Sequence, residues 1–241
     1  MLQGLYSAAA GMAAQQQRID AVANDVANVS TAGYKGTKIA FRDLAYREVP
    51  TGQGVRAGAG AAVMDAGRTH RPGSIETTGQ PLDIAIEGDG YLEVVRPDGR
   101  VGLTRQGALR LDSEGRLVTV TGDVLRPPIR LPRGVELSSV SIAPDGRVTA
   151  AGRLVGRIRL VDVPAPDGLV PIGDSVFVPT AASGPVRAAT GTIRQGALER
   201  SNVDMADAMV DLMEAQRAYA LASRAIQTQD RLMEIANGVK R

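Results

Sequence analysis

Hydrophobic residues near the start of the chain recur at intervals of three and four positions. This spacing is typical of a helix whose apolar stripe packs against a second helix in a coiled coil. It extends over more than three heptads and predicts a helix over residues 3–29, with Gln15 filling the one polar gap. The apolar positions of this pattern are Leu5, Ala8, Met12, Ile19, Val22, Val26 and Val29.

The end of the chain repeats this spacing and predicts a second long helix within residues 201–241. Ser201 and Asn202 are expected to cap its start, because their side chains can accept hydrogen bonds from the free amides of the first turn. The apolar stripe of this helix consists of Met205, Met209, Leu212, Gln216, Tyr219, Ala222, Ile226, Gln229, Met233 and Ala236.

A second apolar stripe lies on the C-terminal helix and contains Leu221, Ala225, Leu232 and Ile235. If the two terminal helices pair as an antiparallel hairpin, each helix buries one stripe and this second stripe stays uncovered. Two interpretations remain open: the middle of the chain packs over it, or other subunits do.

The middle of the chain contains short runs of β-branched residues separated by turn residues, which predict strands. Pro-Asp-Gly occurs at 97–99, 144–146 and 166–168, where Pro and Gly supply the backbone angles of tight turns. Gly88-Asp89-Gly90 is expected to close a tight hairpin. Together these signals predict an all-β sandwich or barrel-like domain over residues 70–190. The predicted strands cover residues 82–87, 91–96, 116–121, 154–161 and 175–179.

The predicted fold class is therefore α+β, with long N- and C-terminal helices that pair as a coiled coil and a central all-β domain. A Gly- and Ala-rich stretch at 51–62 indicates a linker before the β-rich part. The predicted segments are an N-terminal helix (1–32), an extended linker (33–69), the β-rich domain (70–190), a return linker (191–200) and a C-terminal helix (201–241).

Composition narrows the classes of function. Among 241 residues, 44% are hydrophobic and 3% aromatic, and there is no Cys, so disulfides and thiolate sites are excluded. Lys and Arg (28) nearly balance Asp and Glu (26) without a dense basic block, so nucleic acid is not an expected partner. No apolar run reaches the ~18 residues of a membrane span. A secretory signal is not expected either, because the first basic residue is Arg18.

Candidate chemistry is sparse. His70 is the only histidine and is expected in a loop, so a His-based metal cluster is excluded. Gly88-Asp89-Gly90 lacks the third glycine and the following helix of a phosphate-binding loop. Carboxylates such as Asp83 and Asp89 form no catalytic pattern. The sequence therefore predicts neither an enzyme nor a cofactor.

The segment ANDVANVSTAGYKG (23–36) places Asn24, Asp25 and Asn28 at the end of an apolar-periodic helix that Gly33 stops. The two asparagines are four residues apart and share one helix face, where amides can bond to each other or to an adjacent helix. One interpretation is a solvated helix end. The density of amides favours a second, in which they set the register of a contact with another chain, as a buried Asn does in coiled coils.

This segment resembles the signature of bacterial flagellar rod and hook proteins, roughly NNLANVSTxGFK. The chain departs from that pattern at Asp25, where a second Asn is usual, and at Ala222, where members often have Asn. Three further segments are similar to the family and occur in the same order, so the resemblance spans nearly the whole chain. They are TTGQPLDIAIEGDGYLEV (77–94), LTRQGALRLDSEGRLVT (103–119) and QGALERSNVDMADAMVDLMEAQRAYALASRAI (195–226).

The resemblance implies a structural subunit of the flagellar axial structure, located in the basal body. In that family the terminal helices pair and pack with neighbouring subunits into a helical tube, and the β domain forms the outer layer. The implied partners are copies of this chain, neighbouring flagellar rod and hook proteins, and the flagellar type III export apparatus. The expected assembly contacts are Leu5, Met12, Ile19, Asn24, Asn28, Val29, Gly33, Leu212, Tyr219, Ile226 and Met233.

The length of the chain leaves two rod types of this family, the distal one and a proximal one that carries a β domain. The stretch from Phe41 to Asp83 is too short for the full insertion that the distal type often has, but the C-terminal segment is closer to the distal type, so the chain is most similar to that type. Two alternatives stay open. One is a proximal rod subunit of similar size, and the other is a soluble adaptor or cap that binds a partner through the same helices.

Overall fold

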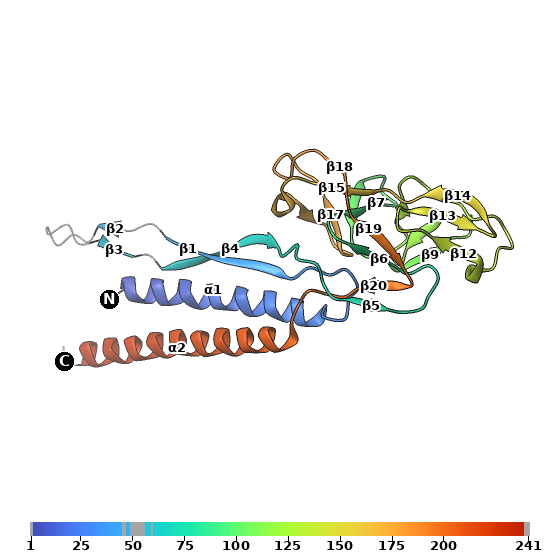
Figure 1. Cartoon of the computed structure of the whole chain (residues 1–241). Helices are drawn as coiled ribbons and strands as arrows, with labels where there is room; N and C mark the ends of the chain where they lie inside the picture. The colour runs from blue at the N-terminus through green and yellow to red at the C-terminus, as the bar shows by residue number, and fades with distance from the viewer. Residues whose placement is uncertain (1, 45–46, 49–55, 59, 239–241) are drawn as a thin grey trace. The chain divides into compact units, whose positions relative to one another are not determined.

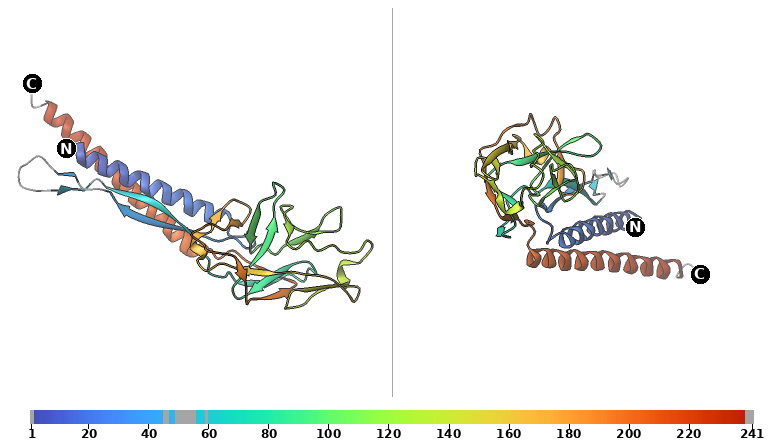
Figure 2. Two further views of the ribbon diagram at one scale, coloured as in Figure 1. Left: turned by 90° about the horizontal axis from the view of Figure 1, so that it is seen from above. Right: turned by 90° about the vertical axis from the view of Figure 1, so that its right-hand side faces the viewer.

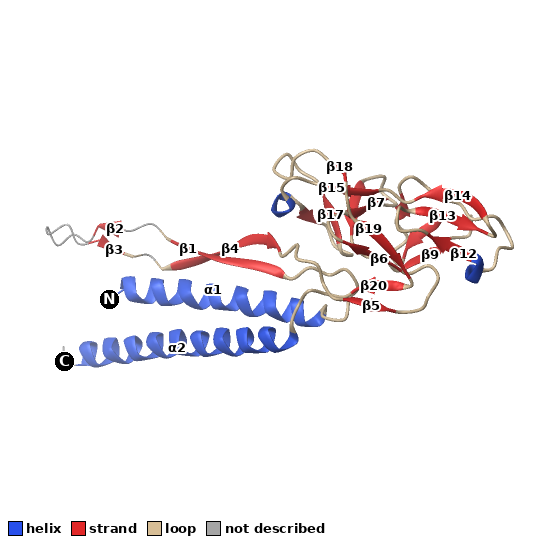
Figure 3. Cartoon of the chain, in the orientation of Figure 1, coloured by secondary structure: helices blue, strands red, loops and turns tan. Residues whose placement is uncertain are grey.

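The computed structural model describes residues 2–44, 47–48, 56–58 and 60–238 (Figure 1). The protein is α+β, with one long helix near each end of the chain and a largely β region between them (Figure 3). This part of the predicted fold class is confirmed. The chain divides into two compact units. Unit 1 comprises Met1–Ala27, Thr37–Ala66 and Asp204–Arg241, and unit 2 comprises Asn28–Gly36 and Gly67–Val203.

Unit 1 contains the two helices, α1 (Leu2–Ala27) and α2 (Met205–Gly238). They lie side by side and run antiparallel (Figure 1 and Figure 2). Arg18 of α1 forms an ion pair with Asp211 of α2, with 2.7 Å between the guanidinium nitrogen and the carboxylate oxygen. Both helices were predicted from their apolar periodicity.

The cap of α2 differs from the predicted one. Asp204 takes this role, because its Oδ1 accepts the backbone N–H of Ala206 at 2.7 Å and that of Asp207 at 3.3 Å. Ser201 and Asn202 precede the helix by several residues and lie in unit 2. A carboxylate next to the first turn suits the cap, because it also interacts favourably with the positive end of the helix dipole.

Two strand pairs follow α1 in the sequence. β1 (Thr37–Asp43) pairs with β4 (Ala61–Arg68), and β2 (Arg47–Glu48) pairs antiparallel with β3 (Arg56–Ala57). A Cβ atom at Gly60 would lie 3.0–3.3 Å from atoms of Ser7 and Ala10, so the backbone before β4 lies close against α1. Paired strands thus occupy much of the segment that was expected as an extended linker. Half of the Gly- and Ala-rich part of that segment, residues 51–55 and 59, lies outside the described residues.

Unit 2 is built from antiparallel sheets. The largest has the strand order β16-β17-β8-β7-β11-β10-β9, and β15 joins it by pairing with β7 and with β18. These strands are β7 (Tyr91–Val95), β8 (Val101–Thr104), β9 (Leu109–Leu111), β10 (Leu117–Thr119), β11 (Val124–Leu125), β15 (Leu160–Asp162), β16 (Val170–Pro171), β17 (Val176–Val178) and β18 (Arg187–Ala188).

Three smaller sheets and two 3-10 helices complete unit 2. The segment expected as a return linker, residues 191–200, forms strands that pair with the first strands of the unit. The sheets are β12 (Val140–Ile142) with β13 (Arg147–Ala150) and β14 (Arg153–Arg157), β6 (Ile84–Glu87) with β19 (Thr192–Gln195), and β5 (Ile75–Thr77) with β20 (Ala197–Glu199). The 3-10 helices are η1 (Leu137–Ser139) and η2 (Pro166–Gly168).

Two local predictions for unit 2 are wrong. Gly88-Asp89-Gly90 closes no hairpin, because β6 pairs with β19 whereas β7 belongs to the large sheet. The predicted strand 154–161 is two strands, β14 and β15, since the chain passes from one sheet to another between them. At this point the buried Ile158 donates its backbone N–H to the carbonyl of Gly146 at 2.8 Å.

The core of unit 2 is mainly aliphatic, as the composition predicts. In its largest cluster Leu92, Val94 and Leu117 have no exposed surface. A second, smaller cluster includes Leu103 together with two aromatic residues, Tyr91 and Phe177. Unit 2 therefore encloses two apolar clusters within one chain.

Candidate assembly surface

The side of α2 that faces α1 is lined by small and half-buried residues. Ala208 and Ala215 are buried, and Leu212, Ile226 and Met233 are half-buried. Alanine at these positions lets the helix backbones approach closely. The predicted residues Leu212, Ile226 and Met233 thus lie on the side that α1 partly covers.

The stripe predicted for α2 needs one adjustment. Met209 is 53% exposed and Gln216 is exposed, whereas the neighbouring Ala208 and Ala215 are buried. The helix is therefore rotated by one residue from the predicted stripe in its first turns, because alanine fits a close contact better than methionine or glutamine does. Tyr219 lies at the edge of the contact and is 38% exposed.

On α1 the predicted residues Leu5, Met12 and Ile19 are all half-buried. The buried positions of this helix are Ala14 and Val22. Because α1 has β1 on one side and α2 on another, its apolar residues are shielded from two directions.

The rest of α2 exposes large apolar side chains. Met205, Met209 and Met213 recur every fourth residue and form one stripe. Leu221, Leu232 and Ile235, from the second predicted stripe, are 56–65% exposed. Among the described residues of unit 1, none covers this second stripe.

Asp25 is the residue of the signature segment that the sequence analysis left unexplained. Its two carboxylate oxygens accept the backbone N–H and the side-chain hydroxyl of Thr37, each at 2.9 Å. These bonds fasten the end of α1 to the start of β1 within unit 1. A carboxylate in place of the usual amide therefore makes a contact inside the chain.

The predicted amides lie at the end of α1 and just beyond it. Asn24 is exposed. Asn28 is half-buried, and its Oδ1 accepts the hydroxyl of Thr31 at 3.2 Å. Val29 is also half-buried. These residues keep accessible surface for a contact with another molecule.

Gly33 occupies a position that only glycine fits well. Its φ is +68°, and an added Cβ would lie 2.7–2.9 Å from backbone atoms of Arg105 and Gln106. Its N–H donates to the carbonyl of Glu199 at 2.8 Å. Gly33 is buried within unit 2, so packing inside the chain accounts for the glycine.

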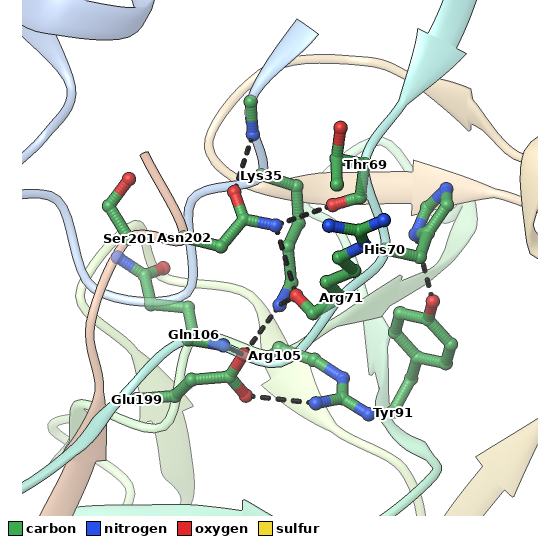
Figure 4. A network of polar contacts seen from close by, with 12 residues as sticks. Lys35, Thr69, His70, Arg71, Tyr91, Arg105, Gln106, Glu199, Ser201 and Asn202 are labelled. Atoms are coloured by element: carbon green, nitrogen blue, oxygen red, sulfur yellow. Dashed lines mark hydrogen bonds and ion pairs between the residues drawn. The ribbon is translucent and has the colours of Figure 1, made fainter. Parts of the chain in front are cut away.

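A buried ionic cluster lies next to Gly33 and consists of Lys35, Arg105 and Glu199 (Figure 4). These residues are 2%, 4% and 1% exposed. One oxygen of Glu199 pairs with the Lys35 amine, and the other pairs with the Arg105 guanidinium at 3.0 Å. Burial lowers the pKa of the Lys35 amine, although the nearby Glu199 carboxylate acts in the opposite direction.

Aromatic residues extend this cluster. The Arg105 guanidinium lies over the ring of Tyr91, with 5.4 Å to the ring centroid. The Tyr91 hydroxyl is 2.9 Å from Nδ1 of His70, and both rings contact Phe177 edge-on. The lone histidine is thus a loop residue that packs in an aromatic group.

The ionic cluster leaves no local pattern in the sequence, because Lys35 and Arg105 lie 164 and 94 residues from Glu199. The available signal was weak. Lys35 closes the signature segment, and Glu199 lies in the last segment that resembles the family.

Neither helix is long and apolar enough to cross a membrane, as far as the described residues show. Within the same residues, His, Asp and Glu side chains form no group of three or more that could hold a metal ion.

Comparison with known proteins identifies three matching family descriptions. "Flagella basal body rod protein" matches residues 5–35, "Flagellar hook protein FlgE/F/G D1 domain" matches 85–150, and "Flagellar basal body rod FlgEFG protein C-terminal" matches 194–239. These ranges cover most of α1, the strands β7 to β11 of the large sheet and all of α2.

Full-length relatives carry the name "Flagellar basal-body rod protein FlgG". The protein from Borreliella burgdorferi is 36% identical, with 100% of both chains covered. Those from Caulobacter vibrioides and Bacillus subtilis are each 32% identical, over 99–100% of this chain and 100% of theirs. The prediction of a rod-family member most similar to the distal rod type is confirmed, as is that of a structural protein rather than an enzyme. The chain therefore belongs to the flagellar basal-body rod protein family and is a structural component of the basal body.

Proposed function

We propose that this protein is a subunit of the distal rod, which assembles through its terminal helices into a helical tube that transmits torque. The helices pair as a coiled coil within each subunit and pack against the helices of neighbouring copies. Further partners are the adjoining rod and hook proteins, and the chain reaches them through the flagellar type III export apparatus. The relatives named FlgG support the rod assignment.

The exposed apolar surface of α2 is the observation that carries this proposal. A helix that is apolar around most of its circumference is normally buried on most sides. α1 covers one side of α2, while Met209, Met213 and Leu232 on other faces are 49–56% exposed. Fully burying an exposed side chain of this size contributes ~1.5–3 kcal/mol, so covering the exposed half of each contributes roughly half of that, and several per subunit add up to a driving force for assembly.

Electron microscopy of basal bodies tests the assignment to the distal rod. Basal bodies from a strain that lacks this protein should end in a short rod without hook, whereas the complemented strain should show the full rod. A proximal subunit would instead leave almost no rod. If complete rods form without the protein, the proposed function is wrong and the result favours the alternative of a soluble adaptor or cap.

Cross-linking tests the surface itself, because the chain contains no Cys and an introduced one is unique. Met213→Cys and Ile235→Cys should form inter-subunit cross-links in isolated basal bodies when a bis-maleimide is added. Asp98→Cys, in the exposed turn between β7 and β8, serves as the comparison site in unit 2. Cross-linking at 98 but at neither helix position would contradict assembly through α2.

A further inference from the structure

Three segments carry the chain from one unit to the other. They are residues 28–36 after α1, residues 67–73 after β4 and residues 199–203 before α2. All three belong to unit 2, and polar groups from each of them meet around the ionic cluster (Figure 4). The cluster lies outside the strands of the large sheet, and Glu199 is the last residue of β20 in a smaller sheet.

Glu199 bonds to all three segments. It belongs to the third, and its Oε1 accepts both the Lys35 amine of the first and the backbone N–H of Gly73 of the second, the latter at 2.9 Å. Its backbone carbonyl accepts the N–H of Gly33 at 2.8 Å. The Lys35 amine also donates to the carbonyl of Arg71 at 2.7 Å, so the first two segments are joined directly.

Asn202 makes the same connections with neutral groups. Its Oδ1 accepts the N–H of Gly36 at 2.9 Å, while its Nδ2 donates to the carbonyls of Thr69 and Arg71 at 2.6 and 2.9 Å. Lys35, Glu199 and Asn202 thus use side-chain groups to link segments that are far apart in sequence.

We propose that Glu199 and Asn202 are positioning residues, which hold the three connecting segments in one arrangement that assembly of the unit 1 helices requires. Neither residue belongs to the large sheet, so we expect that sheet to fold without their side-chain bonds. The part concerning assembly rests on the proposed function, whereas the part concerning the segments rests on this geometry alone.

The directionality of these bonds explains why charged side chains occupy this buried position, although apolar side chains could be buried there at a lower desolvation free energy. A buried ion pair contributes little net stability, because desolvating the ions offsets their attraction, but removing one partner is strongly destabilising. A fixed set of bonds to specific backbone groups selects one arrangement of the segments, which apolar contacts do not.

Hydrogen exchange of the full-length chain, measured by mass spectrometry, tests the arrangement in Glu199→Gln and Asn202→Ala. The matched control is Asp123→Asn, which changes another buried carboxylate of unit 2, whose partners Thr121 and Arg96 lie outside the connecting segments. We expect exchange in residues 28–36, 67–73 and 199–203 to rise roughly tenfold or more in both variants. Exchange in β7 and β10 should stay unchanged, and the control should leave the three segments protected.

Swimming of cells that carry each variant supplies the second readout. Both variants should lose motility, and the control should keep it. A uniform rise of exchange throughout unit 2, or no rise in the segments, would overturn the proposal, and so would normal motility despite loosened segments. If Glu199→Gln fails to fold, the neutral Asn202→Ala variant decides. If the wild-type protein is absent from rods, the proposed function is wrong. The hydrogen-exchange pattern then still tests whether Glu199 and Asn202 hold the three connecting segments.

Discussion

Unit 2 and helix α2 differ in how far their leucine side chains are exposed to solvent. In unit 2, Leu92, Leu103 and Leu117 have no exposed surface, and even the charged Lys35 and Glu199 are shielded from solvent. On α2, leucines at positions 221 and 232 are 65% and 56% exposed. Unit 2 completes its core within one chain, whereas α2 presents apolar surface that a neighbouring molecule can cover. This contrast underlies our proposal that the sheets serve folding and the helix serves assembly.

A leucine-to-alanine substitution in each of the two regions should give the largest difference in the free energy of unfolding. Leu103→Ala removes a fully buried side chain from unit 2 and should lower the free energy of unfolding by about 2–5 kcal/mol, through lost burial and a cavity. Leu232→Ala should change it by less than ~0.5 kcal/mol, because that side chain is already exposed. Urea unfolding of both purified variants measures the difference.

Substitutions at Leu232, which have little effect on the stability of the purified chain, should have a large effect on rod assembly. Leu232→Ala should weaken rods in cells, and Leu232→Asp should abolish them, while the purified chains unfold like wild type. If Leu232→Asp cells swim normally, the exposed stripe faces solvent in the assembled rod and the contrast between the two regions loses its functional meaning.

Alkaline pH should destabilise unit 2 through Tyr91. Burial raises the pKa of its hydroxyl to about 12, above the ordinary value near 10 that it regains on unfolding. The folded state therefore holds this proton more tightly. The corresponding stability is complete below about pH 10 and is lost as the pH rises toward about 12, with a total of about 2–3 kcal/mol. Tyr91→Phe should remove this loss of stability. The test compares the urea unfolding midpoints of the wild type and of this variant at pH 9 and at pH 11.5. Equal pH dependence in both proteins would contradict the assignment.

Alanine substitutions at two glycines of unit 2 with similar φ angles test how the signature segment packs within the chain. Gly33→Ala should destabilise by about 1–3 kcal/mol, because φ is +68° and the new Cβ meets the backbone of Arg105. Gly99→Ala has φ +81° but open space around the Cβ, so it should cost only about 1 kcal/mol. Thermal melting ranks the two variants. Equal melting temperatures would show that contact with the backbone of residues 105–106 is unimportant.

Asn28→Ala is expected to have only a small effect on stability. It removes the partly exposed hydrogen bond to Thr31, so the free energy of unfolding of the purified chain should fall by at most about 0.5–1 kcal/mol. Rods should nevertheless become fragile if the amide contacts a neighbouring subunit. Thr31→Val removes the same intrachain bond and keeps the amide. Equally fragile rods in both variants would assign the effect to the bond inside the chain.

The helices and the class of fold were predictable because their signals are local. A seven-residue apolar repeat determines which side of a helix is covered, and turn residues separate short strands. The strand pairs β1–β4 and β19–β6 were missed, since each depends on a partner strand that lies far away in the sequence. The predicted strand 154–161 failed for a similar reason, because only the tertiary structure shows where the chain changes sheet.

The candidate site was predictable in part. Leu212, Ile226 and Met233 follow the helical period, and the structure places them on one side of α2. Gly33 was recognised as a helix stop, but its contact with Arg105 is a long-range feature. The bonds from Asp25 to Thr37 and from Glu199 to Lys35 leave no periodic pattern, so only coordinates reveal them.

The central claim is that the exposed face of α2 becomes covered in the assembled rod. Maleimide labelling of Leu232→Cys tests it directly, with isolated basal bodies compared against the purified chain and denatured basal bodies providing the full-labelling reference. The account predicts rapid labelling of the purified chain and strong protection in basal bodies, reversed by denaturation. Equal labelling rates in the purified chain and in intact basal bodies would contradict it.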